Sequence, residues 1–266
     1  MTELVAVADR TTDRGAVVRT LTLQRPDKLN PIDKATIAAL EERIERASDD
    51  PAVRVVVVTG AGRAFSAGGD LEGYVELYRD AAAFRRFLET FGRVCDQLEA
   101  ADFVSIAMIN GACVAGGLEL ALACDLLVAS SSAAIADGHL NFGQLPGAGG
   151  SQRLCRAVGL QHAKDLLLTG RTITGDEAAA IGLVVASVAP DELVSRVEAM
   201  ADDVAGHSAL AVRRMRELIR ISQEMDRPEA LQAEMDVVED YATTSADATE
   251  GLVAFLEKRP PEWRGA

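Results

Sequence analysis

The chain twice sends a short, almost wholly apolar segment into a glycine-rich turn, and this feature constrains the fold most. Val53 to Val58 is nearly all valine, and a glycine-rich loop from Gly60 to Asp70 follows it. Val104 to Ile109 is also apolar, and the turn Asn110 to Gly117 follows that segment. Strands with so few polar residues are typical of parallel sheets that are covered on both faces. The repeated order of strand, glycine loop and helix therefore predicts an α/β fold.

The pattern changes after Pro190. Before it, a third glycine-rich loop, Pro146 to Gly150, is expected to open a helix with Ser151 as its N-cap. An amphipathic helix is expected within residues 72–98. After Pro190 the spacing of apolar residues predicts four helices, over residues 191–205, 209–225, 228–242 and 246–257. We therefore divide the chain into an α/β core, residues 1–190, and a helical region, residues 191–266, that packs on the core and on neighbouring subunits.

Charge excludes two classes of partner. The 266 residues include 41 acidic and 27 basic side chains, a net charge of −14. A nucleic-acid-binding protein would carry a basic stripe, and a protein of anionic membrane surfaces would carry a polybasic segment. We expect neither partner. A small anionic ligand remains possible, because a few local lysine and arginine side chains suffice to hold one.

The cysteines and the apolar segments indicate a cytoplasmic protein. The longest apolar stretch, Ala112 to Ala129, contains Glu119 and Asp125, so it does not predict a membrane span. The start of the chain has no apolar core segment of the kind found in signal peptides. No two cysteines form a C-x-x-C pair, and we interpret them as reduced core residues rather than as a metal site or a disulfide frame. They are Cys95, Cys113, Cys124 and Cys155.

The two glycine-rich loops after the apolar strands can work as one device. The first spans Arg63 to Leu71, and the second spans Asn110 to Glu119 and runs into a helix. Glycine lets a ligand approach the backbone closely, and a helix N-terminus offers unpaired N–H groups. Two such N–H groups directed at one oxygen would stabilise an enolate or a tetrahedral oxyanion. Each loop taken alone is better explained as a tight turn, and the functional interpretation gains the advantage only with the rest of the chain.

Further motifs follow in a fixed order through most of the chain. They lie at residues 24–31 (QRPDKLNP), 55–60 (VVVVTG), 64–71 (AFSAGGDL), 109–111 (ING), 116–120 (GGLEL), 145–154 (LPGAGGSQRL), 168–171 (LTGR), 178–184 (AAAIGLV) and 254–259 (AFLEKR). With these motifs the chain resembles the crotonase (enoyl-CoA hydratase/isomerase) superfamily. The resemblance implies a spiral core of ββα turns and a C-terminal helical region that forms a homotrimer, with two trimers often stacked into a hexamer.

The resemblance also implies the ligand and its contacts. The substrate would be an acyl-CoA thioester, with no metal and no cofactor of the enzyme's own. The oxyanion hole would be the backbone N–H groups of Gly69 and Gly116, and the carbonyl of Ala67 would meet the adenine. Phe255 and Lys258 would reach CoA from an adjacent subunit. The expected contacts with CoA or substrate are Lys28, Leu29, Ala67, Gly68, Asp70, Leu71 and Gly117.

The implied catalytic pair departs from the family pattern at one position. Glu119 matches one of two glutamates that handle water in hydratases. The second glutamate normally lies seven residues before the proline of the third glycine loop, here Pro146, and this position holds His139. An ordinary histidine pKa of about 6.5 suits a proton carrier near neutral pH. We expect His139 to give a proton to the α-carbon or to take one from water or substrate. The alternative is a structural loop residue beside a Glu119 that acts alone.

These residues support one leading function and two alternatives. The leading prediction is an enoyl-CoA hydratase, a hydro-lyase that adds water to a 2-enoyl-CoA. The histidine exchange raises a second group, in which the same oxyanion hole serves isomerisation, thioester hydrolysis or C–C cleavage. A third possibility is a catalytically silent trimer that binds acyl-CoA. A wall of the acyl pocket is expected within residues 72–88, which include Tyr74, Leu77, Tyr78 and Phe84.

Overall fold

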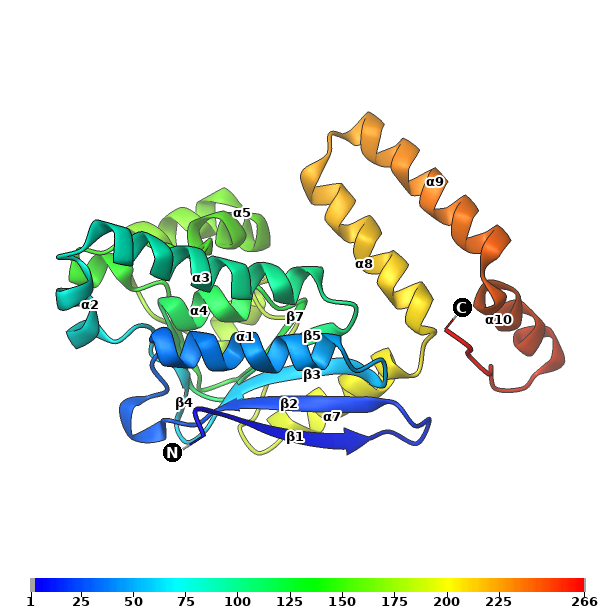
Figure 1. Ribbon diagram of the computed structural model, residues 1–266, viewed down its shortest axis with the longest axis horizontal. Helices are drawn as coiled ribbons and strands as arrows, with labels where there is room; N and C mark the ends of the chain where they lie inside the picture. Colours follow the sequence, from blue (N-terminus) through cyan, green and yellow to red (C-terminus); the bar gives the residue numbers. More distant parts are fainter. Residues whose placement is uncertain (1–2, 266) are drawn as a thin grey trace.

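The computed structural model describes residues 3–265 and is built around a six-stranded sheet (Figure 1). The strands lie in the order β1-β2-β3-β5-β7-β10, with β1 antiparallel to β2 and all other neighbours parallel. This confirms the predicted α/β class. The bounds are β1 Val5–Thr11, β2 Val17–Leu23, β3 Val53–Gly60, β5 Val104–Ile109, β7 Leu126–Ser130 and β10 Ala186–Val188.

A second, four-stranded sheet collects the short strands that follow the long ones. It has the order β4-β6-β8-β9. The chain passes from β3 to β4, from β5 to β6 and from β7 to β8, and a helix follows each of these pairs. This succession is the expected spiral of ββα turns. The bounds are β4 Ala64–Ser66, β6 Ala112–Val114, β8 Ala134–Ala136 and β9 Ile173–Thr174.

Helices cover both faces of the large sheet, which explains the valine run in β3. Val55 and Val57 pack in one cluster with α7, whereas Val56 and Val58 pack in another with α1 and α3. Alternate side chains of a strand point to opposite faces, so a doubly covered strand is apolar throughout. The helices are α1 Lys34–Ser48, α2 Leu71–Leu77, α3 Ala81–Ala100, α4 Gly116–Leu122, α5 Gly150–Thr169, α6 Gly175–Ala180 and α7 Leu193–Ala205, with the 3₁₀ helices η1 Pro26–Lys28 and η2 His139–Phe142.

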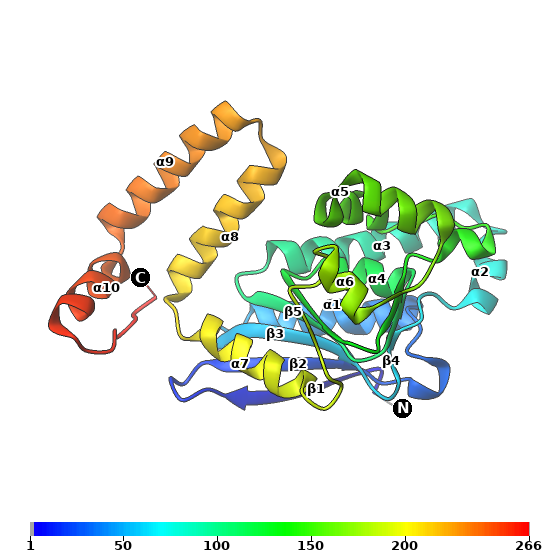
Figure 2. The same ribbon diagram turned by 180° about the vertical axis from the view of Figure 1, so that it is seen from behind.

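The last three helices extend away from this core, as Figures 1 and 2 show. They are α8 Ala209–Glu224, α9 Arg227–Thr244 and α10 Ala246–Glu257. Together with α7 they match the four helices predicted after Pro190. Arg216 of α8 connects these three helices to the core. Its guanidinium donates to Asp125 Oδ1 at 2.9 Å and to the carbonyl oxygens of Leu98 and Glu99 at 3.1 Å.

Some local expectations were wrong. Ser151 is not the N-cap of α5, because the helix already begins at Gly150 and Gly149 caps it with φ 96°, a conformation that favours glycine. The segment expected to hold one helix contains two, since Asp80 starts α3 by accepting from the amides of Ala82 and Ala83 at 3.0 Å. No helix in residues 3–265 is long and apolar enough to cross a membrane.

Candidate active site

The two glycine loops lie side by side because the short strands before them pair. β4 runs parallel to β6, with Ser66 opposite Cys113, so the segments that leave both strands emerge at the same edge. A β-carbon placed on Gly116 would lie 3.9 Å from the amide nitrogen of Gly69, and one placed on Gly68 would lie 3.3 Å from the amide nitrogen of Gly116. The two amides predicted to form the oxyanion hole are therefore close neighbours.

Both amides are available to a ligand. Within residues 3–265, neither the Gly69 nor the Gly116 N–H donates a hydrogen bond to a protein acceptor. Gly116 is the first residue of α4, where the helix leaves its N–H groups unpaired. Ala115, just before it, has φ 51° and ψ −120°, a strained conformation for a residue with a β-carbon. Such strain costs about 1–3 kcal/mol and collects at functional sites.

Asn30 holds the first loop in place. Its amide nitrogen donates to the carbonyl oxygens of Ala61, Ala64 and Phe65 at 3.0, 2.8 and 3.2 Å. Leu29, which lies outside this loop, also holds it, because the Ala67 N–H donates to the Leu29 carbonyl oxygen at 2.9 Å. The structure therefore brings Leu29, which directly follows Lys28, against Ala67. The sequence analysis gave Asn30 no role, although Asn30 lies within the motif at residues 24–31.

Glu119 is held beside the two amides by the third glycine loop. It lies in the first turn of α4 and is only 4 % exposed. Its Oε1 accepts from the amides of Ala148 and Gly150 at 2.7 and 2.9 Å, whereas Oε2 accepts no hydrogen bond from the described part of the chain. Burial raises the pKa of the Glu119 carboxyl, and these two amides together with His139 oppose the rise. A buried carboxylate with one free oxygen is equipped to act as a base.

His139 faces that free oxygen. Its Nε2 lies 3.8 Å from Glu119 Oε2, and its Nδ1 lies 3.1 Å from Asp137 Oδ1. Gly138, with φ 65°, makes the tight turn that folds the ring back onto Asp137. Burial alone would lower the pKa of His139, but the hydrogen bond and charge of Asp137, with the charge of Glu119, raise it overall. The sequence analysis gave Asp137 no role, although it lies two residues before His139, and this short spacing was the available signal.

Comparisons with known proteins identify the family of the chain. The model of the enoyl-CoA hydratase/isomerase family matches residues 13–266. A crotonyl-CoA hydratase from Syntrophomonas wolfei is 36% identical over 90% of this chain and 91% of its own length. The chain belongs to the enoyl-CoA hydratase/isomerase family. A 2,3-dehydroadipyl-CoA hydratase from Escherichia coli is 37% identical over 92% of this chain and 94% of its own length. The crystal structure of an enoyl-CoA hydratase from Bacillus anthracis superposes with a TM-score of 0.92 at 32% identity, covering 99% of this chain and 100% of that one.

In this member of the enoyl-CoA hydratase/isomerase family, Tyr74 of α2 lies directly against Gly69. A β-carbon on Gly69 would lie 2.2 Å from the Tyr74 hydroxyl oxygen. The ring meets Phe87 edge-on, with centroids 5.5 Å apart, and stacks on Tyr78 at 5.9 Å. Burial raises the pKa of the Tyr74 phenol, and the charge of Glu119 adds to the rise.

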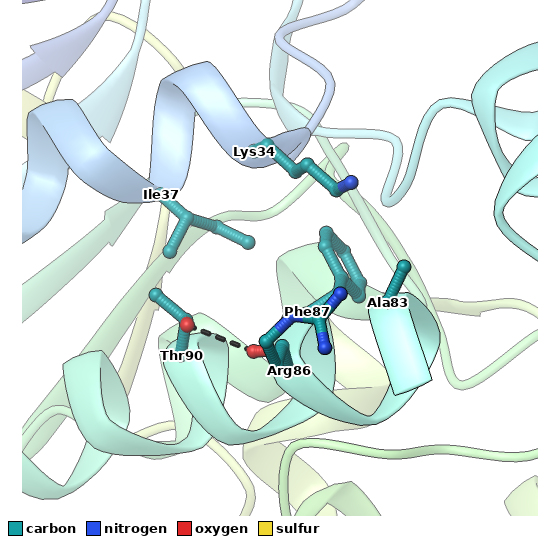
Figure 3. Close-up of a pocket in the computed structure, with 6 residues that line it drawn as sticks. All are labelled: Lys34, Ile37, Ala83, Arg86, Phe87 and Thr90. Atoms are coloured by element: carbon teal, nitrogen blue, oxygen red, sulfur yellow. Dashed lines mark hydrogen bonds between the residues drawn. The ribbon is translucent and has the colours of Figure 1, made fainter. Parts of the chain in front are cut away.

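Behind Tyr74 a pocket of about 480 Å³ opens between α1, α2 and α3. Leu77, Ala83 and Phe87 give it apolar walls, and Asp70 lines it at the start of α2. A smaller pocket of about 260 Å³ adjoins it, and both share Lys34, Ala83 and Phe87. Figure 3 shows the side chains of Lys34 and Ile37 from α1 around this hollow with those of Arg86 and Phe87 from α3. Of the four residues named for the expected acyl-pocket wall within residues 72–88, Tyr74 and Leu77 line this pocket, and its use by an acyl chain stays a prediction.

The remaining predicted contacts fall into two groups. Gly117 is packed against β4, where a β-carbon would meet Ser66 O at 2.4 Å, while Leu71 is 49% exposed at the start of α2. Phe255 and Lys258 lie in and just after α10, far from α2 within this chain (Figure 1).

In residues 3–265 there is no group of three or more His, Cys, Asp or Glu placed to hold a metal ion.

Proposed function

We propose that this protein is an enoyl-CoA hydratase, which adds water across the double bond of a 2-enoyl-CoA. The observation that carries the proposal is the buried Glu119 carboxylate, with one free oxygen, beside two adjacent unpaired amides. Membership of the enoyl-CoA hydratase/isomerase family supports it, and similar proteins carry hydratase names. No observation on the described residues favours isomerisation, hydrolysis, C–C cleavage or a silent binder over hydration.

In the proposed mechanism the two backbone amides, Glu119 and His139 each have one task. The N–H groups of Gly69 and Gly116 hold the thioester oxygen and stabilise the negative charge that develops on it; each such donor is typically worth about 10²–10³ in rate. Glu119 Oε2 accepts a proton from water while the oxygen of that water bonds to the β-carbon. His139 donates a proton to the α-carbon. A general acid or base of this kind contributes about 10²–10⁴-fold.

The proposed CoA contacts follow the loops that lie together. Lys28 and Leu29 flank the nucleotide end, and the carbonyl of Ala67 accepts from the adenine. The thioester end of the acyl-CoA passes between the two glycine-rich loops. It contacts Gly68, Asp70 and Leu71 on the first loop and Gly117 on the second. Coenzyme A enters as part of the substrate, so the proposal includes no metal and no separate cofactor.

A panel of acyl-CoA thioesters tests the function. With crotonyl-CoA we expect loss of the ultraviolet absorbance of the conjugated enoyl thioester, formation of the 3-hydroxyacyl product and no release of free thiol. Thiol release at a comparable rate, or binding of crotonyl-CoA without any turnover, would contradict the proposal. A non-conjugated 3-enoyl-CoA serves as the control for isomerisation and should be converted more slowly than crotonyl-CoA is hydrated.

Tyr74 is expected to limit acyl chain length. Its ring separates the oxyanion hole at Gly69 from the pocket of about 480 Å³. Tyr74→Ala removes this barrier, so the ratio of kcat/KM for 2-decenoyl-CoA to that for crotonyl-CoA should rise about tenfold or more, since each methylene seated in an apolar pocket is worth roughly 1–3 kcal/mol. Tyr74→Phe keeps the ring and should leave the ratio near the wild-type value. An unchanged ratio in Tyr74→Ala would show that the chain leaves by another route.

We extend the proposal to assembly. The region after residue 190 would join subunits into a homotrimer or a dimer of trimers, on the core formed by residues 1–190. Supporting this, the extended helices carry exposed apolar side chains that a subunit interface would bury. They include Met215, Ile219, Leu231, Met235, Val238, Leu252, Phe255 and Leu256. A reducing, cytoplasmic compartment fits the four cysteines, which are all free.

A further inference from the structure

We infer that Asp137 is a positioning residue, which fixes the His139 ring so that its Nε2 N–H is the acid that protonates the α-carbon. This inference rests on the proposed hydratase function and names the division of work between the two groups. Glu119 would handle the proton of water, and His139 would handle the proton of carbon. In the family pattern a glutamate occupies the position of His139, so a ring in this place needs an orienting partner that a carboxylate does not.

Asp137 has the contacts of an orienting group. It is only 3 % exposed, and its hydrogen bonds within residues 3–265 both go to His139. Oδ1 lies 3.1 Å from the ring Nδ1, and Oδ2 accepts from the His139 backbone N–H at 3.4 Å. A buried carboxylate is costly unless a donor or a positive charge compensates it. The Nδ1–H of His139 is that donor, so Nδ1 keeps its proton.

With Nδ1 committed to Asp137, Nε2 is the ring nitrogen left for chemistry. It points toward Glu119 Oε2 across 3.8 Å, which is longer than a hydrogen bond. The two groups therefore face a common space without being bonded to each other. A histidine whose Nδ1–H is held by a carboxylate has a fixed orientation, and its Nε2 becomes more basic. The arrangement is a buried series of carboxylate, imidazole and carboxylate.

The charges around the ring favour the protonated form at the start of the reaction. Asp137 acts from the turn after β8 and Glu119 from α4. Helix α5 also packs against η2, but none of its charged side chains forms an ion pair with His139 among residues 3–265. The two negative charges of Asp137 and Glu119 raise the pKa of His139 despite its burial. The ring is thereby kept as an imidazolium closer to neutral pH.

The proton balance closes without another reactant. The N–H bond at Nε2 breaks as the C–H bond at the enolate α-carbon forms, which leaves neutral imidazole. Glu119 receives the proton that water loses when its oxygen bonds to the β-carbon. After product release the proton passes from Glu119 Oε2 back to Nε2, across the gap of 3.8 Å or through one water molecule. Each cycle then begins again with imidazolium and carboxylate.

The test is the pH profile of Asp137→Asn. Asparagine keeps the shape and an acceptor oxygen but removes the negative charge, so the pKa of His139 should fall. In the wild type, activity should fall as pH rises through the raised pKa of His139, because the acid is then lost. In Asp137→Asn this alkaline limb should move to lower pH, and kcat/KM for crotonyl-CoA should fall about tenfold or more at about pH 8. The reason is that, above the pKa of His139, lowering this pKa by one unit reduces the protonated fraction of the ring about tenfold.

Asp165→Asn is the matched control. Asp165 lies near His162, outside the site, and pairs with Arg171. Its replacement should leave the profile unchanged. A rate loss in Asp137→Asn that is equal at all pH values, or an alkaline limb that stays in place, would overturn the inference.

A second readout does not depend on turnover. The chain has 3 histidines, so ¹³C-labelled imidazole signals are few, and His139→Gln assigns one of them. The titration midpoint of the His139 signal should lie above the ordinary value and fall in Asp137→Asn. A midpoint that does not move refutes the role of Asp137. Absence of crotonyl-CoA hydration in the wild type, with this midpoint shifted, would instead refute the proposed function alone.

Discussion

Replacing Glu119 with glutamine is expected to lower kcat for crotonyl-CoA hydration by about 10³-fold, in the middle of the range for loss of a general base. The amide nitrogen of glutamine takes the place of one carboxylate oxygen and cannot accept a proton from water. Because burial raises the pKa of Glu119, wild-type activity should also fall as pH drops through that raised value, while the carboxylate is being protonated. The pH dependence on the acid side should disappear in Glu119→Gln. Stopped assays of product formation at several pH values measure both effects.

The same substitution keeps the fold, which makes the result interpretable. The glutamine carbonyl can still accept from the amides of Ala148 and Gly150. Glu119→Ala would leave both buried N–H groups without an acceptor, at about 1–3 kcal/mol for each. Glu89→Gln is the matched control, because Glu89 pairs with Arg85 on the exposed face of α3, and it should retain wild-type activity. Turnover within tenfold of wild type in Glu119→Gln would remove Glu119 from the mechanism.

The fold was predictable because its strongest signal is local. Val55 to Val58 are apolar whichever face they point to, and only a sheet covered on both faces needs such a strand. The N-caps of the helices were less predictable from the sequence. Ser151 is a good N-cap by residue type, but Gly149 reaches the left-handed conformation that this turn demands, and the conformation decided where α5 begins.

The site was predictable only in part, for a physical reason. Glycine loops and a glutamate can be recognised in a sequence, whereas hydrogen bonds between distant segments cannot. Asn30 contacts carbonyl groups more than thirty residues away, and the Tyr74 ring reaches Gly69 only because the first turn of α2 directs it back past the N-terminus of that helix. Asp137 is close to His139 in sequence, yet its role depends on the turn at Gly138. Predictions drawn from family motifs carry the positions of groups but not the partners that orient them.

The proposed oxyanion hole can be tested through the residues that hold its two amides in place, since backbone amides cannot be removed by changing a side chain. Gly117→Ala should lower kcat for crotonyl-CoA by about 10²-fold, comparable to loss of one donor. A β-carbon at Gly117 would lie 2.4 Å from the Ser66 carbonyl oxygen and 2.9 Å from the Ser66 β-carbon. The backbone of β4 must therefore move away from α4, which separates the amides of Gly69 and Gly116. Overpacking of this kind should also lower the free energy of unfolding by about 1–3 kcal/mol.

Gly92→Ala separates this effect from a general effect of alanine. Gly92 lies inside α3, and a β-carbon there would meet nothing within 4 Å. Alanine is favoured over glycine in a helix interior by about 1 kcal/mol, so Gly92→Ala should unfold at or above the wild-type temperature and keep its activity. If Gly117→Ala also kept full activity while it lost stability, β4 and α4 would have to separate without moving the two amides apart. The close packing of Gly117 would then be structural, and the adjacency of Gly69 and Gly116 would not depend on it.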